Sequence, residues 1–280
     1  MNKEQQTVQC GLCPHNCTLK SGQTGLCGTR RNVDGEISSI SYGQVTSLAL
    51  DPIEKKPLYH FYPGSAILSL GSFGCNMKCP FCQNHSISQQ GIKMSQGYVA
   101  PPDLVDIARK ATKDAGSIGV AFTYNEPLLS YEYLLDVAPM LKEAGQRVVL
   151  VTNGQIMPEP LEKLLPYVDA MNIDLKTFSP EGYIWLGGDL ATVQKTIQRA
   201  VEAGVHVEVT TLVIPDFNDE PAMMEEEAQW LAKIKKDVPL HLSRYFPRYK
   251  WHAEATPIST LENLQSIARK YLDYVYLGNV

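Results

Sequence analysis

Short apolar runs alternate with longer amphipathic stretches through most of the chain. The runs are almost continuously apolar, which is typical of strands covered on both faces. They lie at 67–70, 118–122, 148–152, 171–175, 205–213, 240–244 and, at the end, 274–277. Helical patterns separate them at 102–115, 128–143, 160–165, 190–201, 223–236 and 261–268. Six strand–helix units in a row predict an α/β fold in which a parallel sheet curls into a partial (β/α)6 TIM-like barrel.

The helices are predicted from apolar residues that recur every three or four positions. In one of them the buried face is expected to contain Leu190, Val193, Ile197, Ala200 and Val201. Gly145 follows the second helix where a helix commonly ends, and Thr260 is expected to cap the last one. The run 225–227 consists of three glutamates and is interpreted as a solvated helix face.

The first 62 residues lack this alternation, so we assign residues 1–62 to an amino-terminal cysteine-rich module and residues 63–280 to the barrel. A small hairpin is expected within 37–50. A proline-punctuated connector at 51–64 carries four consecutive aromatic rings, at 59–62. Such a cluster can line a substrate entrance, but packing against the barrel is the favoured interpretation.

Composition places the chain among ordinary globular proteins, with 280 residues, 44% hydrophobic and 20% charged. No apolar run approaches the roughly 20 residues of a membrane span, which predicts a soluble protein. The polar start of the chain lacks the apolar core of a signal peptide and predicts a cytoplasmic location. Thiols stay reduced there, so cysteine clusters indicate metal rather than disulfides. A net charge of −5 does not indicate a surface that binds nucleic acid.

The first cysteine cluster has the spacing C-x2-C-x3-C-x9-C and comprises Cys10, Cys13, Cys17 and Cys27. Four thiolates on a glycine-bent loop suit either a tetrahedral zinc site or an auxiliary [4Fe-4S] cluster. The spacing does not separate these two metals. A structural role and an electron-relay role are both open alternatives.

The second cluster follows the first apolar run and has the spacing C-x3-C-x2-C, with Cys75, Cys79 and Cys82. A [4Fe-4S] cluster normally takes four thiolates, so three leave one iron open for a small molecule. The alternative is a structural zinc site with His85 as the fourth ligand.

Polar residues follow the other predicted strands at their carboxyl ends, where parallel α/β sheets bind ligands. They are Asn125, Glu126, Asn153, Asp174, Lys176, Thr211, His241 and Arg244. Several have a simpler interpretation as well: Asn125 as a helix cap before Pro127, Asn153 with Gly154 as a common turn pair, Asp174 and Lys176 as a plain ion pair, and His241 as a hydrogen-bonded core residue. The basic and aromatic run 244–252 is expected to form part of the rim of the site.

The cysteine spacing at 75–82 resembles that of the radical SAM superfamily, and the order of motifs resembles its pyruvate formate-lyase activating enzyme branch. Within that branch, segments 10–17, 52–58, 122–127 and 172–176 resemble the radical SAM proteins of the AmmeMemoRadiSam system. The resemblance extends over nearly the whole chain.

The resemblance implies roles for individual residues. Cys75, Cys79 and Cys82 would hold the catalytic [4Fe-4S] cluster, whose open iron chelates S-adenosylmethionine (SAM). The predicted cofactor contacts are Phe81 for adenine, Asn125 and Glu126 for the methionyl amino group, Asn153 for the ribose or carboxylate, and Asp174 and Lys176 for other polar groups of SAM. Thr211, His241 and Arg244 complete this predicted set. One departure is that Tyr124 and Asn125 replace two glycines of the family pattern.

The implied reaction is reductive cleavage of SAM to a 5′-deoxyadenosyl radical, which abstracts hydrogen from a substrate that no motif identifies. Flavodoxin or ferredoxin is the expected reductant, Memo-like proteins are expected partners, and the cluster would be oxygen-sensitive. Two alternatives remain at this point: a glycyl-radical-enzyme activating enzyme, and a non-catalytic scaffold that binds zinc.

Overall fold

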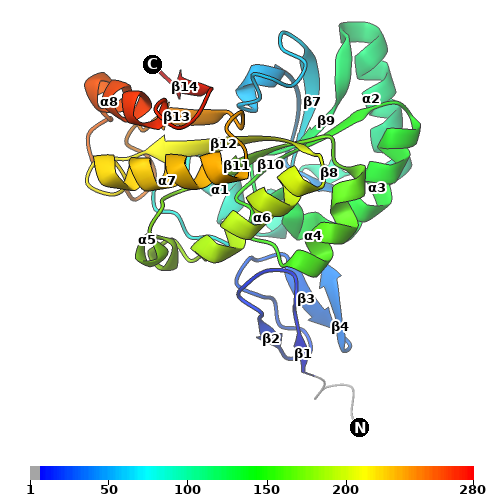
Figure 1. Cartoon of the computed structure of the whole chain (residues 1–280). Coiled ribbons are helices and arrows are strands. Elements are labelled where there is room, and N and C mark those ends of the chain that lie inside the picture. Colours follow the sequence, from blue (N-terminus) through cyan, green and yellow to red (C-terminus); the bar gives the residue numbers. More distant parts are fainter. Residues whose placement is uncertain (1–6) are drawn as a thin grey trace.

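The computed structural model describes residues 7–280. Its main element is an eight-stranded sheet that curls into part of a barrel, with helices on the outside (Figure 1). The strand order is β14-β13-β12-β11-β10-β9-β7-β6, and neighbours from β7 to β14 run parallel. The bounds are β7 Ala66–Gly71, β9 Ser117–Phe122, β10 Arg147–Thr152, β11 Ala170–Asp174, β12 His206–Val213, β13 Leu240–Arg244 and β14 Val275–Gly278. The partial barrel predicted from the apolar runs is confirmed.

The helices that cover the sheet bury the predicted faces. They are α2 Pro101–Ala115, α3 Tyr131–Glu143, α4 Pro158–Leu164, α6 Leu190–Glu202, α7 Pro221–Ile234 and α8 Ile258–Ala268, with shorter α1 His85–Ser88 and α5 Pro180–Trp185. In α6, Leu190, Val193, Ile197 and Ala200 are buried and Val201 is partly buried. Asp189 caps this helix by accepting a hydrogen bond from the Thr192 amide at 2.7 Å.

Two helix predictions need correction. Helix α8 begins at Ile258 after Pro257, so Thr260 lies inside it rather than at its cap. Glu227 of α7 is only 1% exposed, because it faces strand β12 and accepts a hydrogen bond from the Thr211 hydroxyl. The acidic run 225–227 is therefore not uniformly a solvated face.

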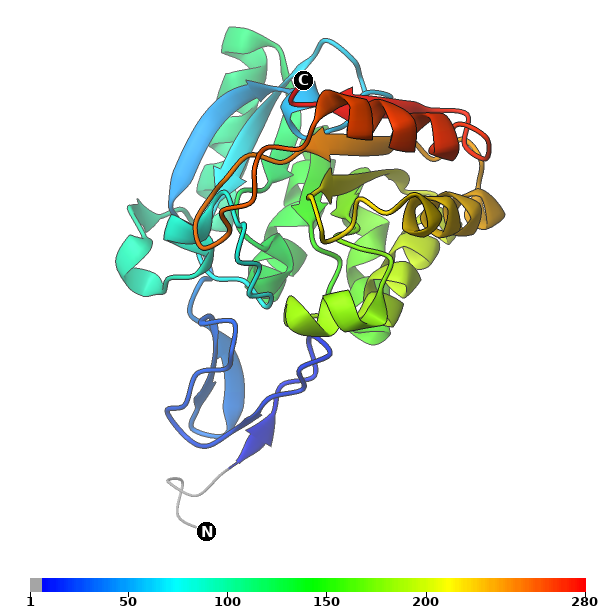
Figure 2. The ribbon, with the colours of Figure 1, turned by 90° about the vertical axis from the view of Figure 1, so that its left-hand side faces the viewer.

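The amino-terminal module contains two small hairpins and projects from one end of the barrel (Figures 1 and 2). β1 Val8–Gln9 pairs with β2 Thr18–Leu19, and β3 Arg30–Val33 pairs with β4 Glu36–Ser39. Farther on, β5 Gln44–Val45 pairs with β8 Gly97–Tyr98. The hairpin expected within 37–50 thus lies earlier, at 30–39.

Strand β6 (Ser47–Pro52) belongs to the main sheet, where it runs antiparallel to β7. The sequence predicted these residues to lie in the hairpin and connector of the amino-terminal module. All six are exposed or partly buried, so the strand does not appear in the sequence as the continuous apolar run of a covered strand. The sheet therefore begins before residue 63, inside the segment assigned to the module.

The connector after β6 closes the amino end of the barrel. The Pro57 carbonyl accepts a hydrogen bond from Asn172 of β11 at 2.9 Å, and the Tyr59 and His60 amides both donate to Glu208 of β12. The aromatic cluster at 59–62 therefore packs on the barrel, as favoured from the sequence.

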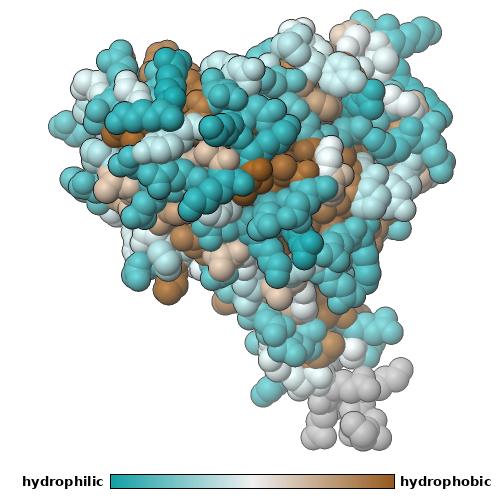
Figure 3. Space-filling view, viewed as in Figure 1, coloured by the Kyte–Doolittle hydropathy of each residue, from teal (hydrophilic) through white to brown (hydrophobic). Residues whose placement is uncertain are grey.

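Within residues 7–280 no helix is long and apolar enough to cross a membrane. The face shown in Figure 3 is largely hydrophilic, with scattered hydrophobic patches.

Candidate active site

The three-cysteine loop leaves the carboxyl end of β7 at Gly74, whose φ of +83° lies in the left-handed region. Two contacts hold this loop. The Lys78 amide donates to the Leu186 carbonyl at 2.8 Å, and the Gln89 side chain donates to the Met77 carbonyl at 3.0 Å. Cys79 is buried, whereas Cys75 and Cys82 are partly exposed.

Hydrogen-bond donors lie beside two of the three sulfur atoms in this loop. Sγ of Cys75 accepts from the Met77 amide at 3.4 Å and from the Asn153 side chain at 3.5 Å. Sγ of Cys82 lies 3.1 Å from the Ser88 hydroxyl. Hydrogen bonds to sulfur are among the features that tune iron–sulfur clusters. Three thiols, two of them with such donors, are a suitable ligand set for a [4Fe-4S] cluster with one open iron.

Burial governs the protonation of the free thiols. It raises the pKa of Cys79 to about 11, although nearby Lys176 acts in the opposite direction. Burial, with the Glu126 carboxylate next in importance, also raises the pKa of Cys75. Metal ligation requires the thiolate form, so binding at this loop would release protons.

His85 was the alternative fourth ligand for zinc. Its Nδ1 lies 3.2 Å from the Cys82 carbonyl oxygen, and its ring stacks on Tyr249 with 4.3 Å between centroids. Among residues 7–280, no three or more His, Cys, Asp or Glu side chains are grouped to hold one metal ion. His85 is thus engaged in contacts other than those of a ligand.

Glu126 lies after β9 and is only 2% exposed. One carboxylate oxygen accepts from the Leu128 amide (3.0 Å) and the Thr152 hydroxyl (2.6 Å), and the other accepts from the Asn153 amide (2.8 Å). Burial nevertheless raises the pKa of Glu126 to about 7, because it outweighs these three hydrogen bonds. Glu126, rather than Asn125, is the cap of the short helix Pro127–Ser130.

Asn125 joins two loops of the site. Its side chain accepts from the Ser72 amide at 2.9 Å and donates to the Phe73 carbonyl at 3.0 Å, just before the cysteine loop. The preceding Tyr124 has a φ of +72°, a conformation that glycine adopts more easily. Its hydroxyl donates to Asp51 at 2.7 Å, and this contact helps to hold the strained backbone.

Asn153 connects the carboxylate to the thiols. Besides its contact with Cys75, its side chain donates to the Asn76 side chain at 2.9 Å, while its backbone amide binds Glu126. Asn153 is 5% exposed. A residue held in this way places an amide beside the first predicted cluster ligand.

Asp174 and Lys176 form an ion pair with 2.6 Å between Oδ2 and Nζ, as their simpler interpretation predicted. The pair also lies beside the thiols. Burial alone lowers the pKa of Lys176, but the charges of Asp174 and Cys79 raise it above its ordinary value. A persistent cation therefore faces the cysteine loop.

Aromatic side chains gather around Phe81, which is 5% exposed. The Phe81 ring lies 6.0 Å from that of Phe217, which is 5.2 Å from Trp185, and Trp185 is 5.3 Å from Trp251. The loop that carries Trp251 touches the cysteine loop, since the Lys250 amide donates to the Pro80 carbonyl at 2.8 Å. The sequence indicated a rim at 244–252, but nothing local connects Trp185 and Phe217 to it.

Three predicted contacts are not brought to this site. Thr211 points to the helix side of the sheet, where it binds Glu227 at 2.6 Å. His241 is near the amino end of β13, and its Nε2 donates to Glu208 at 2.7 Å. Arg244 donates to the Thr256 carbonyl at 2.8 Å and lies over the Phe246 ring. For His241 the interpretation as a hydrogen-bonded core residue is confirmed.

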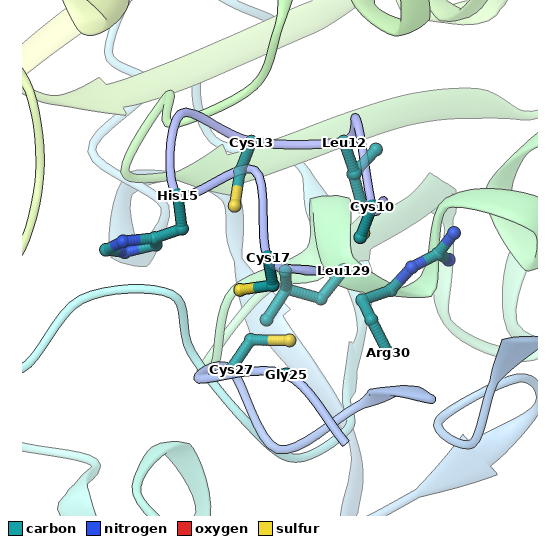
Figure 4. A pocket seen from close by; sticks show the side chains of 9 residues that line it. All are labelled: Cys10, Leu12, Cys13, His15, Cys17, Gly25, Cys27, Arg30 and Leu129. Atoms are coloured by element: carbon teal, nitrogen blue, oxygen red, sulfur yellow. The ribbon is translucent and has the colours of Figure 1, made fainter. Parts of the chain in front are cut away.

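The amino-terminal cysteines meet at a separate place. Cys10, Cys13, Cys17 and Cys27 line one cavity, together with Leu12, His15, Gly25, Arg30 and Leu129 (Figure 4). Burial raises the pKa of Cys13 to about 11. The two cysteine sets that the sequence separates are therefore also two sets in the structure.

Comparison with known proteins agrees with this geometry. The chain is 39% identical to an uncharacterized protein, MJ0808, of Methanocaldococcus jannaschii, over 99% of this chain and 83% of that protein. It is 27% identical to the pyruvate formate-lyase-activating enzyme of Clostridium pasteurianum, over 59% of this chain and 67% of that protein.

Solved structures share the fold. A radical SAM methyltransferase from Sphaerobacter thermophilus aligns over 98% of this chain and 77% of its own, with a TM-score of 0.58 and 15% identity. The sequence family described as the radical SAM superfamily matches residues 70–228, more than half of the chain. With its three-thiol loop at the carboxyl end of β7, the chain is an enzyme that belongs to the radical SAM superfamily.

Proposed function

We propose that Cys75, Cys79 and Cys82 hold a [4Fe-4S] cluster and that SAM binds beside it at the carboxyl end of the barrel. The observation that carries the proposal is the convergence of three strand ends, those of β9, β10 and β11, on the thiols that follow β7: Asn153 touches Cys75, Glu126 lies near Cys75, and Asp174 and Lys176 lie near Cys79. When bound, the reduced cluster supplies the electron that cleaves the sulfonium and yields a 5′-deoxyadenosyl radical for hydrogen abstraction.

The chain's own residues would bind and orient SAM. Glu126 offers a buried carboxylate for the methionyl amino group, and Asn153 offers an amide for the ribose or carboxylate. Phe81 and its aromatic neighbours would pack against adenine and exclude water. Lys176, paired with Asp174, supplies a fixed positive charge beside the thiolates. An external one-electron donor of the flavodoxin or ferredoxin type is required.

The test uses anaerobically reconstituted protein with SAM and dithionite. Cys79→Ala is expected to abolish formation of 5′-deoxyadenosine, because the remaining two thiolates no longer hold the cluster. Undiminished formation by that variant would overturn the proposal. Thr211→Val is a suitable control, since Thr211 faces α7 and its loss is expected to leave the product yield nearly unchanged. Transfer of deuterium from candidate substrates into 5′-deoxyadenosine then identifies the hydrogen donor.

A second candidate function is activation of a glycyl-radical enzyme, favoured by the similarity to the activating enzyme of Clostridium pasteurianum. In that case the hydrogen comes from a backbone glycine of a partner protein. The partner would then show a glycyl doublet in electron paramagnetic resonance. Deuterium transfer from a small molecule, with no doublet in any glycyl-radical enzyme tested, would exclude this candidate.

A further inference from the structure

The amino-terminal cysteines surround a cavity rather than a point. Cys10, Cys13 and Cys27 are buried, Cys17 is partly exposed, and all four line the cavity (Figure 4). A four-thiolate zinc site is closed around one ion, with each sulfur at about 2.3 Å. A cubane cluster is a larger body that receives one thiolate at each iron. A cavity with thiols along its wall fits the second arrangement.

Arg30 supplies an independent observation. Its guanidinium, on a side chain 8% exposed, forms a two-point ion pair with Glu132, one contact of which measures 2.7 Å. Its Nε is buried without a carbonyl, carboxylate or hydroxyl acceptor among the described residues, and the side chain within hydrogen-bond reach of the guanidinium on this wall is the Cys10 thiol. Arg30 lines the cavity beside Cys10 (Figure 4). A buried donor is normally paired, and a bound iron–sulfur cluster would supply acceptor sulfur atoms on this wall.

The cavity lies against the three-cysteine loop. A methyl group added at Gly74 would come within 2.7 Å of the Cys27 carbonyl oxygen and 2.4 Å of the Thr29 side chain. On the other side of Cys75, Nε2 of His15 donates to the Asn76 carbonyl at 2.7 Å. The module therefore packs against both neighbours of the first thiol of the active site.

Asn76 joins the two sets of thiols. It is 2% exposed, it follows Cys75 directly in the chain, and its side chain is a hydrogen-bond neighbour of the Cys13 thiol. The same side chain accepts from Asn153, which touches Cys75. Asn76 thus provides a continuous path of covalent and hydrogen bonds between Cys13 and Cys75, along which an electron can pass.

From these observations we infer that Cys10, Cys13, Cys17 and Cys27 hold a second [4Fe-4S] cluster that passes single electrons to the cluster at Cys75, Cys79 and Cys82. The relay part of this inference rests on the proposed function. A flavodoxin-type donor reduces the second cluster from 2+ to 1+. The electron then moves to the SAM-binding cluster, which goes from 2+ to 1+ as the second cluster returns to 2+.

The metal site is tested in the full chain after anaerobic reconstitution. Wild type is expected to hold about eight iron atoms per chain, and Cys79→Ala and Cys13→Ala about four each. The cluster signal left in Cys79→Ala should not respond to SAM, whereas that left in Cys13→Ala should. Zinc, or no metal, in Cys79→Ala overturns the inference. Because Cys79→Ala leaves the amino-terminal module intact, the metal content of this variant tests the second site even if Cys13→Ala fails to fold.

The relay is tested by reducing the SAM-binding cluster of wild type and Cys13→Ala with flavodoxin or with dithionite. We expect Cys13→Ala to lose rapid reduction by flavodoxin and to keep reduction by dithionite, a small molecule that needs no relay. Equal rates with flavodoxin in both proteins overturn the relay. Failure of wild type to cleave SAM would defeat the proposed function, yet leave the iron content of Cys79→Ala as a separate measure of the second site.

Discussion

The two ends of the barrel each contain a buried carboxylate, and the two differ in protonation. Glu208, at the closed amino end, accepts four hydrogen bonds, from two backbone amides and from His206 and His241. Glu126, at the opposite end, accepts three, and the nearby Asp174 acts against its ionisation. Both are 2% exposed or less.

The pKa values of these two carboxyl groups shift in opposite directions. Burial opposes ionisation of Glu208, but its four donors outweigh burial and lower its pKa from 4.5 to about 2. Its contribution to stability is therefore present above pH 4.5 and is lost as the pH falls toward 2. Burial prevails at Glu126, whose pKa rises from 4.5 to about 7, so this group costs stability as the pH rises through that interval. The closed end favours stability, and the open end retains a carboxyl group that can change its charge.

The largest effect is expected from Glu208→Ala. Removing the carboxylate leaves four donors without an acceptor, and breaking a buried pair costs about 3–5 kcal/mol of unfolding free energy. Urea unfolding measures the loss, and SAM affinity of the folded fraction should stay close to wild type. Glu159→Ala, which removes only an exposed ion pair with Lys163, is the control and should unfold nearly as wild type does. Equal stability of the two variants would contradict a structural role for the closed end.

A third buried carboxyl group extends the comparison. Among the described residues Glu227 accepts one hydrogen bond, from Thr211, and burial raises its pKa from 4.5 to about 8. The wild type should therefore lose on the order of 3 kcal/mol of stability between pH 6 and pH 9. Glu227→Gln, which stays neutral, should lose much less. Chemical unfolding at the two pH values checks this, and parallel losses in both proteins would assign the pH effect elsewhere.

A smaller effect is expected from Glu126→Gln. The new amide group would face the Asn153 amide, so one donor loses its acceptor at a cost of about 1–3 kcal/mol. Because Asn153 touches Cys75, SAM affinity should fall roughly tenfold or more. Calorimetry or filter binding of SAM measures the change. Unaltered affinity together with unaltered stability would show that the open end does not depend on this carboxylate.

The sequence predicted the barrel because its inner strands are covered on both faces and appear as continuous apolar runs. Strand β6 was missed for the converse reason, since most of its residues are exposed or half-buried. The cysteine loop could be proposed as a ligand set from the sequence because its spacing is local. Closure of the amino end by residues 57–61 joins positions more than 100 apart in the chain, and no local pattern reports it.

Side-chain direction explains why predicted contacts such as Thr211 lie away from the three-cysteine loop. Successive residues of a strand point to opposite faces, so a position near a strand end does not determine which face a side chain occupies. In β12, Thr210 binds Asn172 inside the barrel, whereas Thr211 binds Glu227 on the helix side. His241 was placed at the wrong end for a related reason, because an apolar run does not show how far along the strand a residue lies.

The segment that closes the amino end also determines how molecules reach the reaction centre. Leu58 is fully buried and Tyr59 packs on His241, so the connector covers that end of the barrel. On the proposed function, the reacting molecules would therefore arrive and depart at the carboxyl end. The molecule bound deepest in the barrel, SAM in this proposal, would then bind first and dissociate last. A bulky substrate bound above it would shield a radical from water.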